Sequence, residues 1–366
     1  MMKIAIDIRA SNGTKAGKGW YTLVMVKELL KRDTKNQYLL YTNELNPSFA
    51  KYTNARQVEI KKSGLSWHLA VRRDLKRTRP DVFWAPTSYI LPAIMPRGIR
   101  TVITVHDVIA FIFPDGHDKK ALWLERLTLH RAIKRADHIS TVSRSTKNDL
   151  MKMFHVQDKK VDIAPCASSS IFKPVKDRFA LNAVREKYNL PEKFILGLGT
   201  LSPRKNFTRL IKAYAQTLPK HPDVHLVIVG PKGWNCNDLI PFEQSDKVHF
   251  IGYVDGEDIA ALYSLAKIFV FPSLYEGFGI PPLEAMACGC PVITSNVSSL
   301  PEVVGNSAML IDPYSVEDIA NAIDIILSNA YIQEDLREKG LFRARKFSWG
   351  VSAERVLDLF ESKPLQ

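Results

Sequence analysis

The chain has no long hydrophobic run. No uninterrupted apolar stretch in its 366 residues approaches the roughly 18 residues that cross a bilayer, so we expect no transmembrane helix. The first residues, Met-Met-Lys-Ile-Ala-Ile-Asp, hold an apolar run that is too short for a signal peptide and instead predict a strand. These absences favour a protein that folds and works in water.

Cysteine is also scarce. The four cysteines, Cys166, Cys236, Cys288 and Cys290, form no disulfide framework, and Cys288 and Cys290 lack the second ligand pair of a zinc site. We therefore expect a reducing, cytoplasmic setting. Short repeats, low-complexity segments and RNA- or DNA-binding motifs are missing from the sequence as well, which argues against a nucleic-acid partner.

Positive charge, in contrast, is abundant and uneven. The net charge is +13, and residues 1–180 carry 33 Lys and Arg against 16 Asp and Glu, a surplus of +17. The remainder carries 18 against 22, a charge of −4. This asymmetry favours an anionic partner for the first half, although a basic face that only keeps the protein in solution would give the same composition.

Two series of short apolar strands alternate with helical patterns along the chain. The first series is predicted at 3–7, 38–41, 81–84, 100–105, 136–143 and 160–164, and the second at 193–199, 225–230, 248–252, 268–271, 291–294 and 308–312. Such alternation predicts α/β domains with parallel sheets. We expect two Rossmann-like domains, residues 1–175 and 176–349, with a ligand cleft between them. An amphipathic helix at about 350–366 is expected to pack back on the first domain.

The stretch 268–294 is the feature around which the chain is organised. A buried strand leads into a Gly-rich turn, a short helix that starts near Pro281, and a second strand. Free N–H groups and the positive end of the helix dipole make such a turn an anion site. Glu276 lies on the turn, and Glu284 lies about one helical turn into the helix. The two carboxylates are thus placed to reach different parts of one elongated ligand.

Residues 275–293, Tyr-Glu-Gly-Phe-Gly-Ile-Pro-Pro-Leu-Glu-Ala-Met-Ala-Cys-Gly-Cys-Pro-Val-Ile, resemble the Glu-x7-Glu signature of retaining GT-B glycosyltransferases of family 4, also called glycosyl transferase group 1. Residues 199–206 resemble the phosphate loop of that family, 250–254 its base-binding strand end, and 226–230 and the final Phe-Ser-Trp helix also match. The resemblance covers most of the chain. It implies a GT-B fold with the donor in the cleft between the domains.

The resemblance assigns most of the donor contacts. Glu284 would bind the ribose diol and Glu276 the transferred sugar, whereas each carboxylate could otherwise be only a helix or turn charge. The remaining donor-binding residues would come from the Gly-rich turn and the two matching strand ends; they are Phe278, Gly279 and Ile280, which offer N–H donors, and Gly230 and Val254.

Lys205 and Arg204 could stabilise the departing diphosphate, or merely solvate the start of a helix. Adjacent side chains are expected to diverge, and the resemblance favours Lys205 as the one that faces the donor. The family commonly has Arg where this chain has Thr200, and Arg204 is the candidate to replace it.

In the first half, His106 resembles the family histidine that approaches the donor sugar, although a hydrogen-bonded structural histidine is the alternative. His106 and Asp107 are neighbours at a strand end and should diverge, so we expect no base–orienter dyad. Gly17 and Gly19 would let the first loop approach the donor phosphate closely.

Retention of configuration follows from the resemblance, by a front-face transfer in which the departing phosphate oxygen takes the proton of the acceptor. No Asp-x-Asp motif stands at a suitable strand end, so we expect no metal and no cofactor beyond the nucleotide-sugar co-substrate. Mannose from GDP-mannose is the favoured donor, because residues 203–206 resemble mannosyltransferase-like members of the family.

A lipid-linked or polysaccharide acceptor is expected. The basic amphipathic segments 66–78 and 119–131 predict peripheral binding at the inner face of an anionic membrane, although their apolar stripes could equally pack on the sheet. The alternatives are a UDP-sugar-dependent transferase, a nucleotide-sugar epimerase and a non-catalytic GT-B subunit. A glycoside hydrolase would have two carboxylates but no use for the Lys205 loop.

Overall fold

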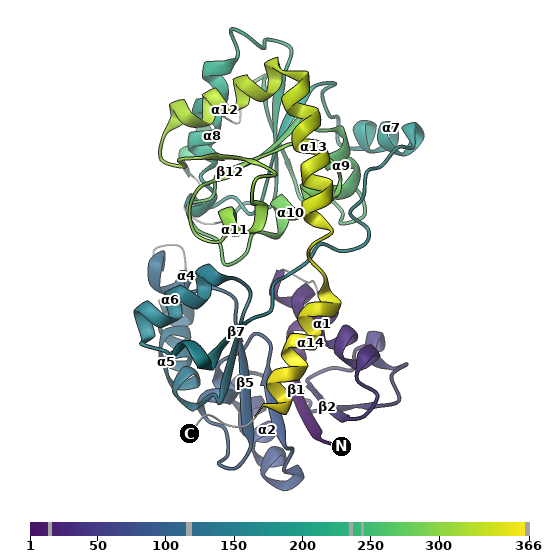
Figure 1. The fold of residues 1–366 in the computed structure, drawn as a ribbon, viewed down its shortest axis with the longest axis vertical. Coiled ribbons are helices and arrows are strands. Elements are labelled where there is room, and N and C mark those ends of the chain that lie inside the picture. The colour runs from purple at the N-terminus through teal and green to yellow at the C-terminus, as the bar shows by residue number, and fades with distance from the viewer. Residues whose placement is uncertain (14–16, 115–118, 234–236, 243–244, 363–366) are drawn as a thin grey trace. The chain divides into compact units, whose positions relative to one another are not determined.

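A computed structural model of the chain describes residues 1–13, 17–114, 119–233, 237–242 and 245–362. The chain forms two compact units (Figure 1). Unit 1 comprises Met1–Cys166 and the chain from Ser348 onward, and unit 2 comprises Ala167–Phe347.

Unit 1 is built on a seven-stranded parallel sheet in the order β3-β2-β1-β4-β5-β6-β7. The strands are β1 Lys3–Asp7, β2 Gln37–Thr42, β3 Ala55–Glu59, β4 Val82–Ala85, β5 Arg100–Val105, β6 His138–Thr141 and β7 Val161–Ile163. Its helices are α1 Gly17–Arg32, α2 Gly64–Thr78, α3 Ile90–Ala93, α4 Ile109–Ile112, α5 Lys119–Arg135, α6 Arg144–Phe154 and α14 Trp349–Glu361, with 3-10 turns η1 Arg9–Ser11, η2 Pro47–Phe49 and η4 Asp158–Lys160.

The C-terminal helix α14 packs beside α1 within unit 1 (Figure 1). The rings of Tyr21 and Trp349 lie 5.8 Å apart, and Ser352 Oγ donates to Pro165 O at 2.5 Å. The apolar stripe of the terminal helix is thereby buried on unit 1.

Unit 2 has a six-stranded parallel sheet in the order β10-β9-β8-β11-β12-β13. The strands are β8 Phe194–Leu198, β9 His225–Val229, β10 Val248–Gly252, β11 Ile268–Phe271, β12 Val292–Ser295 and β13 Met309–Ile311. Its helices are α7 Arg178–Lys187, α8 Phe207–Thr217, α9 Ile259–Leu265, α10 Ile280–Ala287, α11 Leu300–Val304, α12 Val316–Ser328 and α13 Ala330–Ala344, with 3-10 turns η5 Pro203–Lys205 and η6 Asn237–Phe242.

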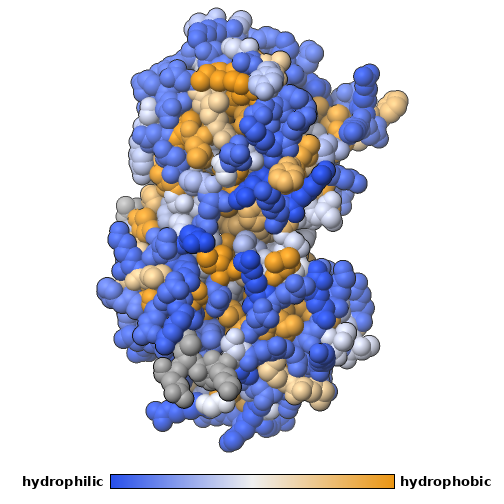
Figure 2. All heavy atoms as spheres, viewed as in Figure 1, coloured by the Kyte–Doolittle hydropathy of each residue, from blue (hydrophilic) through white to orange (hydrophobic). Residues whose placement is uncertain are grey.

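The central strands are apolar on both faces because helices cover both sides of each sheet. Every residue of β4 (Val-Phe-Trp-Ala) and of β11 (Ile-Phe-Val-Phe) is buried. Hydrophilic side chains predominate over both units on the face drawn in Figure 2. Among the described residues, no helix combines the length and the hydrophobicity needed to cross a bilayer.

The predicted α/β class with two parallel sheets is confirmed. The strand Ala55–Glu59 and the helices Val316–Ser328 and Ala330–Ala344 were not anticipated. The sequence placed the domain boundary at 175/176, whereas residues 167–175 pack with unit 2. Val175 N donates there to Ser264 Oγ at 3.0 Å, and the Phe172 ring lies 6.2 Å from that of Tyr263.

Both sheets reverse their strand order once, between β1 and β4 in unit 1 and between β8 and β11 in unit 2. In sheets of this kind, loops that leave the carboxyl ends of these strands diverge to opposite faces, and ligands commonly bind where they part. In unit 2 these loops contain the predicted residues 199–206 and 272–280.

Candidate active site

The two cations after β8 converge on the carboxylate after β11. Lys205 Nζ and Arg204 Nη1 each lie 2.6 Å from Glu276 Oε1. Arg204 Nη1 also donates to Tyr275 O at 2.5 Å. The expectation that Arg204 and Lys205 diverge is therefore wrong. They belong to the 3-10 turn η5 rather than to an extended strand, and in such a turn neighbouring side chains can reach one point.

This cluster of Arg204, Lys205 and Glu276 is largely withdrawn from water. The side chains are 18%, 12% and 12% exposed, and Lys205 Nζ stands 4.4 Å above the ring of Phe271. Burial lowers the pKa of Lys205 although Glu276 opposes the shift. Burial alone would raise the pKa of Glu276, but Lys205 and Arg204 outweigh it and lower that pKa. The cluster thus sets two basic side chains against one acidic side chain.

Polar residues that the sequence analysis did not single out fix the two loops. Asn206 adopts a left-handed conformation (φ 62°), and its side-chain amide donates to Pro272 O at 3.0 Å and to Pro313 O at 2.7 Å. Ser298 Oγ accepts from Glu276 N at 3.0 Å, and Ser299 Oγ donates to Glu276 O at 2.9 Å. These bonds hold the backbone of Glu276 from both sides. The Ser-Ser-Leu-Pro-Glu pattern signals only the start of a helix, so it could not reveal this role.

The turn before α10 presents free donors. Within the part of the chain that the structure describes, the N–H groups of Phe278, Gly279 and Ile280 have no hydrogen-bond partner. Gly279 takes φ +100°, and a Cβ there would lie 2.7 Å from Leu300 Cδ2, so only glycine fits. Free N–H groups beside a surplus cation form a site for an anion.

Glu284, on α10, differs from Glu276 in its surroundings. Among the described residues, the one hydrogen bond to its carboxylate is a long contact of 3.5 Å from Tyr263 OH, and no cation pairs with that carboxylate there. Burial raises its pKa to about 7. The carboxylate thus retains acceptor capacity for a ligand that brings its own donors, as a vicinal diol does.

Two further predicted residues lie at the carboxyl ends of β9 and β10. Gly230 has φ +147°, and a Cβ there would lie 2.1 Å from Gly199 O. Close packing of the ends of β8 and β9 therefore explains this glycine without a ligand. Val254 is buried and follows Tyr253, whose side chain is exposed.

In unit 1, His106 follows the carboxyl end of β5. It is 8% exposed, its Nε2 lies 2.8 Å from Pro86 O, and its ring meets that of Tyr21 edge-on at 4.5 Å. Because a carbonyl only accepts, Nε2 carries the proton, which leaves Nδ1 as an acceptor. Burial, followed by the charge of Lys18, lowers the pKa of His106 to about 4, so the ring is neutral at physiological pH.

Asp107 turns to a different partner, as the expected divergence from His106 requires. Lys18 Nζ lies 3.6 Å from Asp107 Oδ2, and this carboxylate raises the pKa of Lys18. Lys18 was not among the predicted residues, although it stands between Gly17 and Gly19. These glycines belong to the first turn of α1, where a Cβ on Gly17 would meet nothing within 4 Å.

The predicted residues thus form two groups, one at each unit's carboxyl strand ends. The prediction that Glu276 and His106 face one cleft stays a prediction. Within the described ranges, no three His, Cys, Asp or Glu side chains are grouped to hold a metal ion.

Comparison with known proteins bears on both units. Residues 182–341 match the family "Glycosyl transferases group 1", and residues 19–167 match "Glycosyltransferase Family 4". The chain is similar to O-antigen chain mannosyltransferase B of Escherichia coli, with 36% identity over 292 residues, 78% of this chain and 75% of that protein. It is also similar to serotype-specific mannosyltransferase WbdA of Escherichia coli, with 31% identity over 71% of this chain and 33% of that protein.

A solved structure of Anabaena Alr3699/HepE in complex with UDP and glucose has the same fold. It matches with a TM-score of 0.78 at 18% identity, over 99% of this chain and 100% of that chain.

Proposed function

The chain belongs to the glycosyl transferases group 1 and is a glycosyltransferase of GT-B fold, and from this premise we propose that it transfers mannose from GDP-mannose to a saccharide acceptor with retention of anomeric configuration. The observation that carries the choice of sugar is the 36% identity to an O-antigen chain mannosyltransferase over 78% of this chain. The observation that carries the chemistry is the cluster around Glu276.

Departure of a nucleoside diphosphate is the demanding part of such a transfer, because negative charge builds up on the leaving oxygen. Lys205, Arg204 and the free N–H groups of the turn before α10 supply donors to that charge. Their burial strengthens the interaction, since little water competes for the anion. Glu276 holds both cations in place before the donor arrives, so little reorganisation is needed during reaction.

Retention is proposed to proceed on one face of the sugar. The bond from C1 to the phosphate oxygen breaks with its electron pair going to the diphosphate, and the acceptor oxygen bonds to C1 on the same face. The acceptor proton passes to the departing phosphate oxygen. This route needs no nucleophile from the protein, and it suits a Glu276 whose oxygen is occupied by two cations.

The remaining residues recognise hydroxyl groups in this proposal. Glu284 accepts from the ribose diol, for which its lack of a cation and its single long hydrogen bond leave room. His106 serves the transferred sugar. Its proton is committed to Pro86 O, so neutral Nδ1 can accept from a sugar hydroxyl but cannot act as an acid. The reaction is proposed to need no metal ion.

A saccharide on a lipid carrier or a growing polysaccharide is the proposed acceptor, since one of the similar proteins is named for the O-antigen chain. Peripheral binding to an anionic membrane is part of the proposal. Its support is the basic first half of the sequence together with Trp123, Leu124 and Leu127 of α5, which are exposed.

A second candidate donor is a UDP-sugar, which the complex of Anabaena Alr3699/HepE with UDP and glucose favours. Thermal shift separates the candidates, because a ligand that binds only the folded state raises the unfolding temperature. GDP-mannose should stabilise the protein by about 2.7 kcal/mol at 100 times its Kd, and GDP should do so too. A response to UDP-glucose but not to GDP-mannose would overturn the choice of donor.

Turnover is then measured with radiolabelled GDP-mannose and a mannose-terminated oligosaccharide, and the linkage formed is assigned by NMR. An α-linked product from the α-configured donor supports retention, and a β-linked product refutes it. Loss of turnover in a chelator, with recovery in Mn²⁺, would refute the metal-free mechanism.

A further inference from the structure

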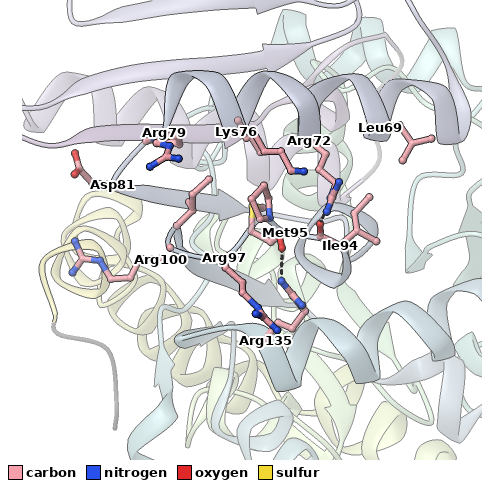
Figure 3. A pocket seen from close by; sticks show the side chains of 15 residues that line it. Leu69, Arg72, Lys76, Arg79, Asp81, Ile94, Met95, Arg97, Arg100 and Arg135 are labelled. Atoms are coloured by element: carbon pink, nitrogen blue, oxygen red, sulfur yellow. Dashed lines mark hydrogen bonds between the residues drawn. The ribbon is translucent and has the colours of Figure 1, made fainter.

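Unit 1 contains an open groove at the amino ends of its central strands (Figure 3). Its volume is about 1090 Å³. The walls come from the second half of α2, the segment before β4, the segment 94–100 that leads into β5, and the last residue of α5.

The groove is strongly cationic. Six of its lining residues are basic and one, Asp81, is acidic. The basic residues are Arg72, Lys76, Arg79, Arg97, Arg100 and Arg135. Across the described ranges none of the six has a carboxylate within 4.0 Å, and Asp81 already accepts from Lys3 N at 2.7 Å. Six basic side chains against one carboxylate leave a surplus of positive charge, so an anion that entered the groove would relieve the repulsion between them.

Backbone carbonyls hold several of these guanidinium groups in position. Arg72 Nε donates to Ile94 O at 2.7 Å, Arg135 donates to Met95 O, and Arg100 Nη1 donates to Ser362 O at 2.6 Å. Figure 3 shows the first two of these bonds as dashed lines on either side of Met95. A guanidinium has five N–H donors, so each tethered arginine keeps donors for a ligand while losing little freedom on binding.

The groove is separate from the candidate residues of the same unit. Arg100 begins β5 and lines the groove, whereas His106 follows the end of that strand. At about 3.3 Å per residue these positions lie roughly 20 Å apart, at opposite ends of β5. A ligand of the groove therefore cannot be the sugar nucleotide that His106 serves.

We propose that this groove is a second, independent anion site that binds a phosphate-bearing ligand. Several arginines converging on one space suit phosphate oxygens, which accept from each guanidinium in pairs. Leu69, which lines the groove, and Leu65 one helical turn earlier are 52% and 66% exposed. The same chemistry therefore fits a free phosphate or diphosphate and the headgroup of an anionic lipid, and the experiment distinguishes these two sources.

The test compares the full-length protein with K76A/R97A. Neither side chain makes a hydrogen bond or ion pair among the described residues, so the fold should not change. The matched control is R56A/K62A, which removes the same charge from exposed positions of unit 1 outside the groove and outside segment 66–78. A second variant, K76Q/R97Q, replaces the first if its unfolding midpoint falls.

Pyrophosphate binding is measured by calorimetry, and vesicle binding by sedimentation with phosphatidylglycerol against phosphatidylcholine. We expect K76A/R97A to bind one of the two anionic probes at least tenfold more weakly, and the control to stay within about twofold of wild type, at an ionic strength of about 0.1 M. The probe that responds identifies the source of the phosphate.

The proposal is overturned if the groove variant binds both probes as tightly as wild type, or if the control loses as much as the groove variant. Neither measurement involves glycosyl transfer, so the result is independent of the proposed donor, acceptor and mechanism. The phosphatidylglycerol arm alone also bears on the proposed membrane binding.

Discussion

The two units share a strand order and differ in the charge that they place at its reversal. In unit 2, Lys205 and Arg204 share one carboxylate, Glu276, which leaves a surplus positive charge beside free N–H groups. In unit 1, Lys18 Nζ lies 3.6 Å from Asp107 Oδ2, and the neighbouring His106 is neutral. The same topology thus places two basic side chains on one carboxylate in unit 2, and a lysine paired with a carboxylate beside a neutral imidazole in unit 1.

This difference suggests that the two units recognise different chemical groups of the substrates. A surplus cation suits the diphosphate, whose charge grows as it leaves, whereas a neutral imidazole acceptor suits uncharged hydroxyl groups. The two candidate carboxylates of unit 2, Glu276 and Glu284, also differ in the charge that surrounds them. Glu276 is held by cations that lower its pKa, while Glu284 has only a distant hydroxyl and a raised pKa.

The largest effect should come from Glu276→Gln. The amide keeps the size of the side chain but gives up the charge that pairs with Lys205 and Arg204, so both cations shift. We expect kcat to fall by about 10²–10³ with the fold retained, the range found when a transition-state donor is removed. The control is Glu257→Gln, which alters an exposed carboxylate of the same unit. Full activity in Glu276→Gln would show that the charge of this carboxylate is not needed for turnover.

Replacing Lys205 in unit 2 and Lys18 in unit 1 tests the comparison between the two units directly. Lys205→Met should lower kcat by about 10², because it removes a buried donor to the leaving group. Lys18→Met should lower it less than tenfold, since Lys18 is 44% exposed and balanced by Asp107. Equal losses in steady-state assays of the two variants would show that both units act on the diphosphate.

The ionisation of Glu284 should give donor binding a pH dependence. The raised pKa of about 7 means that the group is neutral below pH 7 and a carboxylate, the better acceptor for a diol, above it. Affinity for the nucleotide should therefore rise about tenfold from pH 6 to pH 8. Calorimetry at several pH values checks this rise, which Glu284→Gln should abolish. A rise that persists in the variant would belong to another group.

The smallest effect is expected from Gly17→Ala. A Cβ at this position meets nothing within 4 Å, so the unfolding midpoint should stay unchanged. If the loop approaches the donor phosphate, kcat/KM should nevertheless fall a few-fold because the methyl group blocks that approach. Unchanged kcat/KM would show that Gly17 does not contribute to the donor site. His106 would then be the remaining candidate from unit 1.

Local pattern was sufficient for much of the fold. The bounds of β5 and β11 coincide with the predicted segments, because each is a short apolar run with clear ends. The strand β3, Ala-Arg-Gln-Val-Glu, is too polar to be recognised, and its pairing with β2 at the sheet edge defines it. The polar helix α13 likewise depends on packing, in its case against α10 and α12.

Within the candidate site, the sequence indicated residue types better than their contacts. Glu276, Lys205 and Glu284 were identified from motif and spacing, but the convergence of Arg204 on Glu276 depends on the turn η5 and on Asn206 in a left-handed conformation. Lys18 and the serines at 298 and 299 contact the predicted residues only after folding, from positions that no local pattern connects to them.

The sequence by itself determined that the chain alternates strands and helices in two series, and that a Gly-rich turn with two glutamates follows a buried strand. Both properties are local, since side-chain periodicity and glycine conformation act over a few residues. The tertiary structure decided which cations contact Glu276, why Glu284 has a raised pKa, and that six basic residues gather around a single acidic one in the groove at the amino ends of the central strands of unit 1. Charge interactions and burial depend on distance in space, which only the packed chain sets.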